Sequence, residues 1–248
     1  MNKGDKTRNR ERGMLSGKRA VVTGGSRGIG FRIAEALVEN GVRTVICGRS
    51  EDALQQAVKR LGESGGEVLG RVCDVGRPEP VEELIRFSEE RLGGLDILIN
   101  NAAVGIFRSV VEMSPQQWRT LMRTNLDSLF YCCHYALPVL CRSGEGFIVN
   151  IGSLAGKNAF PEGAAYCASK FGLKAFSEAL MQEVRYDDIR VAYVMPGSVN
   201  TGFGGHSEAE GSWKLSPRDV ADVVIDTLRR DRRCLTSCIE MRPSKPRK

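Results

Sequence analysis

The stretch RAVVTGGSRGIG, residues 19–30, joins a short apolar run to a glycine-rich turn and to the start of a helical pattern. Glycines in such a turn allow tight backbone geometry and a close approach of the backbone to a ligand. The free N–H groups at the start of the helix can then hold the phosphates of a dinucleotide. The spacing G-x-x-x-G-x-G differs from the G-x-G-x-x-G fingerprint, and such turns can also serve packing alone. We interpret the stretch as a strand, a dinucleotide-binding turn and a helix.

Short apolar runs alternate with longer helical patterns around this stretch. The later runs are RTVICG (43–48), GEVLGRVCD (66–74), LDILIN (95–100), GFIVNIGS (146–153) and IRVAYVMPG (189–197). Nearly continuous β-branched runs are typical of strands buried on both faces of a parallel sheet. The order predicts an α/β fold: a single-domain, Rossmann-type, doubly wound parallel sheet of about seven strands with helices on both faces.

The segments between these runs have the length and the stop signals of helices. They include residues 29–41, 50–62, 78–94 and 114–141, and we expect the last of these to form one long helix. In doubly wound sheets, ligands bind beyond the carboxyl ends of the strands. We therefore expect the functional residues to follow directly after the apolar runs.

The net charge of +6 in 248 residues belongs to the two ends of the chain. Residues 1–18 hold six basic and two acidic side chains, and residues 240–248 hold four basic and one acidic, which leaves −1 for the remainder. Because nucleic-acid binding depends on basic surface, a body so close to neutral argues against a nucleic-acid partner.

The ends also set the expected organisation of the chain. Residues 1–16 are expected to form a disordered basic lead, with Met14 as an alternative natural start. Residues 17–240 are expected to form the folded domain, and residues 241–248 a basic tail. No apolar run approaches the length of a membrane span, so we expect no membrane partner and a cytoplasmic location.

Eight cysteines and two histidines raise the question of disulfides and metal sites. No two cysteines have C-x-x-C spacing, and several lie in apolar runs, where a thiol acts as a small hydrophobic group. Reduced thiols are the better interpretation. His134 and His206 are far apart in sequence, so we expect no metal site.

The stretch YCASK places Tyr166 and Lys170 four residues apart. On a helix these positions share one face, so the phenol and the amine can approach the same point. By itself the spacing fits equally well an amphipathic helix with a solvated lysine. Ser153, which follows the fifth apolar run, precedes Tyr166 by thirteen residues.

With these motifs in this order, the chain from about residue 17 to about residue 228 resembles the classical short-chain dehydrogenase/reductase family. The resemblance implies an oxidoreductase that transfers a hydride between a nicotinamide cofactor and a carbonyl or secondary alcohol. It further implies that Ser153 bonds the substrate oxygen and that Tyr166 passes a proton to or from it. Lys170 would hold the nicotinamide ribose, and Asn125 would hold a water that links Lys170 to solvent.

The proposed pairing has a physical rationale. A free phenol has a pKa near 10 and would be a slow base at neutral pH. We expect the Lys170 ammonium to lower the pKa of Tyr166 by favouring the phenolate. For Asn125, the alternative is a helix-interior asparagine that faces water or bonds locally.

The resemblance also implies a cofactor site. Its residues are Gly24, Ser26, Arg27, Gly28, Ile29, Gly30, Arg49, Asp74, Val75, Asn101, Ala102, Tyr166, Lys170, Pro196, Gly197, Val199 and Thr201. Asp74 would accept a hydrogen bond from the adenine amino group, with a simple turn residue as the alternative. Ala103 stands where the family has glycine, and it would strain the backbone if that position needs a positive φ.

The choice between NAD and NADP follows from charge. An NAD site usually has an acidic residue after the second strand, whereas arginine suits the 2′-phosphate of NADP. Arg49 stands at that point and Arg27 lies in the glycine turn, and two guanidiniums can clamp a phosphate. Glu51 and Asp52 follow where a helix begins and suit its dipole. We predict NADP(H) as the cofactor.

Residues 201–214 are expected to form a mobile substrate lid, in which Phe203, His206 and Trp213 are candidate substrate contacts. The chain is similar to the 3-oxoacyl-acyl-carrier-protein reductases, but it ends in a basic, proline-containing tail instead of a glycine-rich strand. The resemblance implies an NADPH-dependent ketone or 3-oxoacyl reductase, with a small-molecule carbonyl or alcohol substrate, that forms a homodimer or homotetramer. Alternatives are a sugar/polyol or steroid-type alcohol dehydrogenase and a catalytically silent NADP-binding sensor.

Overall fold

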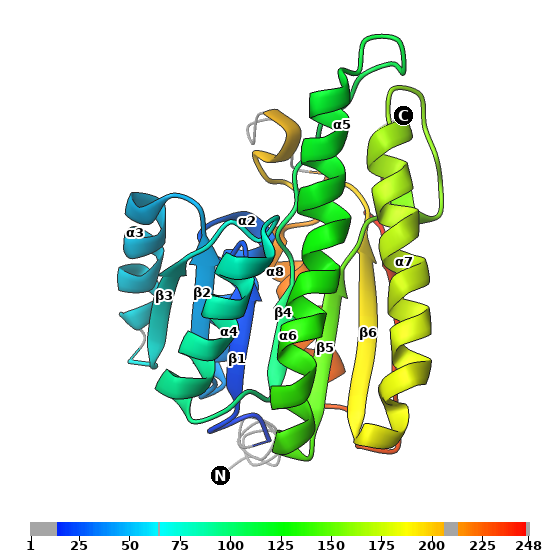
Figure 1. The fold of residues 1–248 in the computed structure, drawn as a ribbon. Coiled ribbons are helices and arrows are strands. Elements are labelled where there is room, and N and C mark those ends of the chain that lie inside the picture. The colour runs from blue at the N-terminus through cyan, green and yellow to red at the C-terminus, as the bar shows by residue number, and fades with distance from the viewer. Residues whose placement is uncertain (1–13, 64, 206–212, 247–248) are drawn as a thin grey trace.

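One parallel sheet organises the computed structural model, which describes residues 14–63, 65–205 and 213–246. In the described part of the chain, the sheet has seven strands in the order β3-β2-β1-β4-β5-β6-β7, which reverses between β1 and β4 (Figure 1). The strands are β1 (Arg19–Thr23), β2 (Arg43–Gly48), β3 (Val68–Val72), β4 (Ile97–Asn100), β5 (Gly146–Ile151), β6 (Ile189–Pro196) and β7 (Cys238–Met241). This confirms the predicted doubly wound fold.

Helices cover both faces of the sheet. They are α2 (Gly28–Glu39), α3 (Glu51–Gly62), α4 (Pro78–Leu92), α5 (Pro115–Met122), α6 (Ser128–Ser143), α7 (Ala164–Val184) and α8 (Pro217–Leu228). Helices α4, α6 and α7 lie in front of the sheet in Figure 1, and α2 and α8 lie behind it. All strands point toward the upper edge of this view, so the loops at their carboxyl ends lie there together.

Two hydrophobic cores result from the alternation of side chains along each strand. Val22 packs in one core with residues of α2, α3 and α8, whereas its neighbour Val21 packs in the other with residues of α4, α6 and α7. The central strands are buried on both faces, which explains their nearly continuous apolar sequence.

Strand β3 departs from the expectation that the strands are buried on both faces. Gly70, Arg71 and Val72 are exposed. The reason is its position, because β3 is the edge strand of the sheet and pairs only with β2 in the described residues. Arg71 at this edge forms an ion pair with Glu83 of α4.

The segment 114–141, expected to be one long helix, is interrupted by a π-helical turn. Helix α5 ends at Met122, the π turn spans Arg123–Asp127, and α6 then runs to Ser143. A π turn adds a residue to the helical repeat and changes the direction of the side chains that follow, and such turns are frequent at functional sites. Asn125 lies inside this turn and is 2% exposed.

The folded part is slightly wider than the sequence boundaries 17 and 240. Leu15 is buried in a hydrophobic core, and the Gly17 N–H donates to the Gly41 carbonyl oxygen at 2.9 Å. At the other end, Met241 belongs to β7 and pairs with Pro196 of β6. Most of the expected basic lead, residues 1–13, and the end of the tail, residues 247–248, lie outside the described residues.

Three further features bear on the sequence predictions. All eight cysteines have free thiols. None of the helices in the described part of the chain has the length and apolar character needed to cross a bilayer. Within the same residues, no three side chains of His, Cys, Asp or Glu are grouped as metal ligands would be.

Candidate active site

The glycine turn between β1 and α2 is tight on one side and open on the other. Gly24 and Gly28 have φ values of +64° and +59°, a region that glycine adopts readily. A Cβ at Gly30 would collide with the Gly24 carbonyl oxygen and with the side-chain amide of Asn101. A Cβ at Gly28 would meet nothing closer than Thr201, at 3.6 Å. The turn therefore faces open space in the direction of the turn after β6.

The N-terminus of α2 is left without a protein cap. Its N-cap residue, Arg27, makes no side-chain capping bond, and the first turn contains no acidic residue. Helices α3, α5 and α8, by contrast, are capped by Ser50, Ser114 and Ser216. The free N–H groups and the positive end of the helix dipole thus remain for an anion. This end of α2 fits the pyrophosphate of a dinucleotide.

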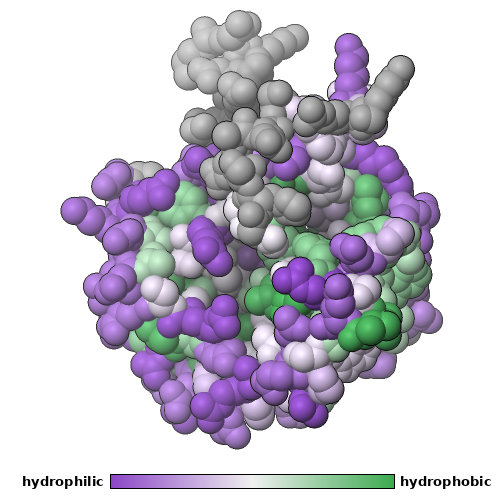
Figure 2. Space-filling view, turned by 90° about the horizontal axis from the view of Figure 1, so that it is seen from above, coloured by the Kyte–Doolittle hydropathy of each residue, from purple (hydrophilic) through white to green (hydrophobic). Residues whose placement is uncertain are grey.

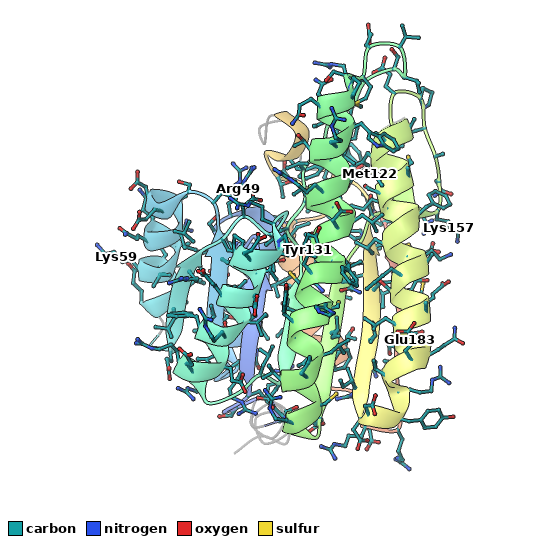
Figure 3. The ribbon with its side chains drawn as sticks, in the orientation of Figure 1. Arg49, Lys59, Met122, Tyr131, Lys157 and Glu183 are labelled. Atoms are coloured by element: carbon teal, nitrogen blue, oxygen red, sulfur yellow. The ribbon has the colours of Figure 1, made fainter. Side chains whose placement is uncertain are left out.

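Arg27 and Arg49 stand on adjoining segments at the same edge of the sheet. A Cβ at Gly48, the last residue of β2, would lie only 3.2 Å from the Ser26 hydroxyl, so the end of β2 adjoins the glycine turn. Both guanidiniums are exposed, and neither has an ion pair within the described ranges. Figure 3 shows Arg49 extending from the upper end of the sheet. Both guanidiniums are therefore available to bind a phosphate group.

Thr23, which sequence analysis assigned no role, ties the glycine turn to the loop after β4. Its hydroxyl oxygen accepts the N–H groups of Asn101 at 3.0 Å and Ala102 at 3.1 Å, and it donates to the Ile99 carbonyl oxygen. The Asn101 amide in turn donates to the carbonyl oxygens of Thr23 and Gly24. Asn101 and Ala102 therefore lie beside the turn, and this network holds its shape. The sequence feature that could have identified Thr23 is its position directly before the glycines of the turn.

Asp74 follows β3 and acts as a turn residue. Its Oδ1 atom accepts the Gly76 N–H at 3.1 Å, and its Oδ2 atom lies 3.6 Å from a guanidinium nitrogen of Arg123. The adjacent Val75 packs in the hydrophobic core. This is the turn role that the sequence left open, and the contact with adenine stays a prediction.

The turn after β6 carries the remaining implied cofactor residues, Pro196, Gly197, Val199 and Thr201. The Gly197 N–H donates to the Met241 carbonyl oxygen at 2.8 Å, so β7 holds the start of the turn. Thr201 faces Gly28 across the open side of the glycine turn. The structure thus brings together two segments that are about 170 residues apart in sequence, as expected at the carboxyl edge of the sheet.

Ser153, Tyr166 and Lys170 meet beyond the carboxyl end of β5. Ser153 is the second residue after this strand, and the other two lie one helical turn apart on α7. Tyr166 is 8% and Lys170 3% exposed. The Lys170 ammonium lies 5.8 Å from the centre of the Tyr166 ring and donates to the Ile151 carbonyl oxygen at 3.2 Å. The solvated-lysine alternative is therefore wrong.

The pKa of Tyr166 is shifted in the direction opposite to the one expected. Burial raises the pKa of its phenol to about 12, and a side-chain interaction with Ser153 only partly opposes this shift. Burial also lowers the pKa of Lys170 to about 8. Desolvation by burial is the largest influence on the pKa of each of the two side chains. At neutral pH the phenol is protonated and can donate.

Asn125 holds the loop after β4. Its Oδ1 atom accepts the Val104 N–H at 2.8 Å, and its Nδ2 atom donates to the Val104 carbonyl oxygen at 3.0 Å and to the Ser169 hydroxyl at 3.2 Å. The side chain is thus adjacent to the helical turn that carries Lys170. Ala103, beside it, has no positive φ, so the expected strain is not present.

Aromatic side chains cover the phenol of Tyr166. The ring centres of Phe107 and Phe203 lie 5.3 Å and 6.0 Å from that of Tyr166. Phe203 was a candidate substrate contact from the sequence, whereas Phe107 was missed, although it lies in a loop that follows a strand. Trp213 contacts Lys214, and His206 lies outside the described residues, as does half of the expected lid, residues 206–212.

Comparisons with known proteins agree with this geometry. The family model described as short chain dehydrogenase matches residues 18–211. An uncharacterized oxidoreductase of Staphylococcus saprophyticus is 31% identical over 230 residues, which are 92% of this chain and 98% of that protein.

Two solved structures are similar along nearly their whole length. An alcohol dehydrogenase from the archaeon Thermococcus sibiricus, complexed with 5-hydroxy-NADP, superposes with a TM-score of 0.88 at 29% identity and covers 93% of this chain and 98% of its own. A metagenomic short-chain oxidoreductase in complex with NADP has a TM-score of 0.83 at 34% identity, with 94% and 100% covered.

Proposed function

The chain belongs to the short-chain dehydrogenase/reductase family of oxidoreductases, and on this premise we propose that it reduces ketones with NADPH. The observation that carries the proposal is the buried, protonated phenol of Tyr166 beside Ser153 and Lys170. The phenol is protonated at neutral pH and can therefore give a proton to a carbonyl oxygen, as reduction requires.

We propose that the cofactor binds at the glycine turn, the N-terminus of α2 and the two nearby arginines. The uncapped N-terminus of α2 would hold the pyrophosphate, and Gly28 leaves the space for it. Arg27 and Arg49 would bind the 2′-phosphate, which supports NADP over NAD. The structures of similar proteins complexed with NADP or 5-hydroxy-NADP support the same choice.

When bound, the cofactor would supply a hydride to the carbonyl carbon of the substrate. The Tyr166 hydroxyl would give its proton to the carbonyl oxygen, and the Ser153 hydroxyl would donate a hydrogen bond to the same oxygen. Lys170 is mostly protonated at pH 7, since its pKa is about 8. Its charge stabilises the phenolate that forms when the proton leaves Tyr166. Asn125 fixes the loop beside this pair through Val104.

Several finer assignments stay proposals. A 3-oxoacyl substrate has no support beyond the resemblance in sequence. A silent NADP-binding protein is disfavoured because Ser153, Tyr166, Lys170 and Asn125 are all present and buried or half-buried. We propose a homodimer or homotetramer built on α5, α6 and α7, because each exposes a large aromatic side chain: Trp118, Phe130 and Phe171.

The test is the consumption of NADPH and of NADH against ketones, aldehydes, 3-oxoacyl thioesters and ketoses. We expect turnover of at least one ketone with NADPH, and we expect Tyr166→Phe to reduce kcat by about 10² to 10⁴-fold while NADPH still binds. Unchanged turnover in Tyr166→Phe would overturn the mechanism. Tight NADPH binding without reduction of any carbonyl would favour the silent protein.

A further inference from the structure

Three phenylalanines from three different loops form a chain of ring contacts with Tyr166, which lies between Phe107 and Phe203. Phe107 follows β4, Phe160 follows β5 and Phe203 follows β6. The Phe107 ring lies 6.0 Å from Phe160 and 5.3 Å, edge-on, from Tyr166, which Phe203 contacts at 6.0 Å. We infer that the ketone accepted by this site carries an aromatic or similarly bulky apolar group, held by these three side chains. The inference rests on the proposed function and narrows its substrate class.

The described side chains packed around the Tyr166 ring form an apolar cluster. The cluster that contains Tyr166 is built from Leu121, Ala155, Ala165 and Cys167, with Ile106, Phe107, Met113, Met122 and Phe203 packed against it. Ser153 and Tyr166 supply the polar atoms for one carbonyl oxygen. A carboxylate or several hydroxyl groups on the same substrate would lose water without gaining partners from these side chains. An apolar group gains from burial against them.

Gly105 makes the close approach of the rings possible. A Cβ at this position would lie 2.6 Å from a ring carbon of Phe203 and 3.1 Å from one of Phe107. Real Cβ atoms do not come within 2.6 Å of a neighbouring atom, so any other residue would push the Phe203 ring away from the loop after β4 and would crowd the Phe107 ring. The glycine therefore serves the placement of two aromatic side chains next to the phenol.

A backbone contact fixes the outer end of the ring chain. The Arg108 N–H donates to the Glu162 carbonyl oxygen at 2.9 Å, which ties the loop of Phe107 to the loop of Phe160. Glu162 adopts a left-handed conformation with φ 62°, which is costly for a residue with a side chain. Phe160 is 43% exposed and is thus the outermost of the three rings. Figure 2, which looks down on this edge, shows hydrophobic patches among hydrophilic side chains.

Arg108 and Lys157, two cations on the described parts of these loops, have partners of their own. Arg108 donates to the Phe107 carbonyl oxygen at 3.1 Å, and Lys157 forms an ion pair with Glu240 at 2.6 Å. Figure 3 shows Lys157 on the outer side of α7. An anionic group on the substrate would have to compete with these partners.

The test compares four ketones at saturating NADPH: acetophenone, cyclohexyl methyl ketone, 4-acetylbenzoate and dihydroxyacetone. We expect kcat/KM for the two uncharged, bulky ketones to exceed that for 4-acetylbenzoate and dihydroxyacetone by about tenfold or more. Equal or better use of the charged or the polar ketone would overturn the inference but leave the proposed function standing. If NADPH binds and none of the four is reduced, the inference fails, and the wider panel of carbonyl compounds decides whether the proposed function stands.

Variants then test the assigned residues. Phe107→Ala and Phe203→Ala should lower kcat/KM for acetophenone about tenfold, with a smaller change for dihydroxyacetone. Phe107→Leu keeps apolar volume in case the alanine variant does not fold, and it should retain most of the activity on cyclohexyl methyl ketone. Tyr186→Ala is the control, because this aromatic side chain is 90% exposed and lies beyond the end of α7, and the substitution should change neither activity. Equal losses on all ketones would contradict a role in substrate choice.

Discussion

The Lys170 ammonium lies 5.8 Å from the ring centre of Tyr166, and burial shifts the pKa values of the two side chains in opposite directions. The pKa of the Tyr166 phenol is raised to about 12, and the pKa of the Lys170 amine is lowered to about 8. At neutral pH the pair therefore consists of a neutral donor and a cation, which is the combination that carbonyl reduction needs.

This relationship predicts the pH dependence of reduction. The proton on Tyr166 is retained up to a pKa of about 12, so the phenol itself does not limit activity near neutral pH. Lys170 loses its charge as the pH rises through about 8, and with it the stabilisation of the phenolate formed in the reaction. We expect kcat/KM to be level near pH 7 and to fall above pH 8, measured by initial rates at saturating NADPH. A rate that increases from pH 7 to pH 9 would contradict this assignment.

Lys170 should be costly for stability. Its folded pKa of about 8 lies below the ordinary 10.5, so the unfolded chain binds more protons between these values and stability rises with pH across that window. Below pH 8 the cost of the buried charge is fully present. Lys170→Met should therefore raise the free energy of unfolding at pH 7 by ~1–3 kcal/mol, and turnover should fall by about 10²-fold or more.

Urea denaturation at pH 7 and at pH 10 measures this effect. The advantage of the methionine variant should shrink at pH 10, where the wild-type amine is neutral in the folded protein. A methionine variant that is less stable than the wild type at pH 7 would show that Lys170 contributes net stability, contrary to this prediction.

Arg49 should determine the choice of cofactor. Arg49→Asp removes a charge-assisted contact with the 2′-phosphate and adds repulsion, so the ratio of kcat/KM for NADPH to that for NADH should fall about 10- to 100-fold. Lys59→Asp is the control, because this side chain lies on the outer side of α3, away from the glycine turn (Figure 3). An unchanged ratio in Arg49→Asp would remove the residue from the cofactor site.

Thr23 should matter for both the turn and the stability of the protein. Thr23→Val has nearly the same shape but leaves the N–H groups of Asn101 and Ala102 without their acceptor. We expect a loss of ~1–3 kcal/mol in the free energy of unfolding and a raised KM for NADPH. Thr23→Ser keeps the hydroxyl, so it should retain most of the stability and most of the affinity for NADPH. Thermal unfolding and NADPH titration measure the two quantities. Equal behaviour of the two variants would argue that only packing matters at this position.

Glu145 should stabilise the folded protein at neutral pH, and this contribution should be lost in acid. Its carboxylate lies 2.8 Å from Arg232 and 3.0 Å from Lys18, and these cations lower its pKa to about 2. Because the folded pKa lies below the ordinary 4.5, the contribution is present above pH 4.5 and is lost as the pH falls toward 2. The side chain is partly exposed, so Glu145→Gln should cost only ~1 kcal/mol at pH 7.

Unfolding curves at several pH values test this. The difference between wild type and Glu145→Gln should decrease between pH 4.5 and pH 2. A difference that stays constant over this range would show that the loss in the variant is not electrostatic.

Much of the fold was predictable because its signals are local. Six of the strands coincide with apolar runs in the sequence, and the helices between them end where glycine or polar residues interrupt the pattern. The exposure of β3 and the π turn at Asn125 were not predictable. The first depends on which strand lies at the edge of the sheet, and the second on how α5 and α6 pack against their neighbours.

The sequence by itself determined the architecture, the family resemblance and the set of residues at the carboxyl edge of the sheet. Periodicity, glycine spacing and the four-residue interval between Tyr166 and Lys170 are properties of neighbouring residues. Only the tertiary structure decided the sign of the Tyr166 pKa shift, the role of Thr23 and the convergence of Phe107, Phe160 and Phe203. Desolvation and ring packing depend on segments that are distant in the chain, and folding alone brings those segments together.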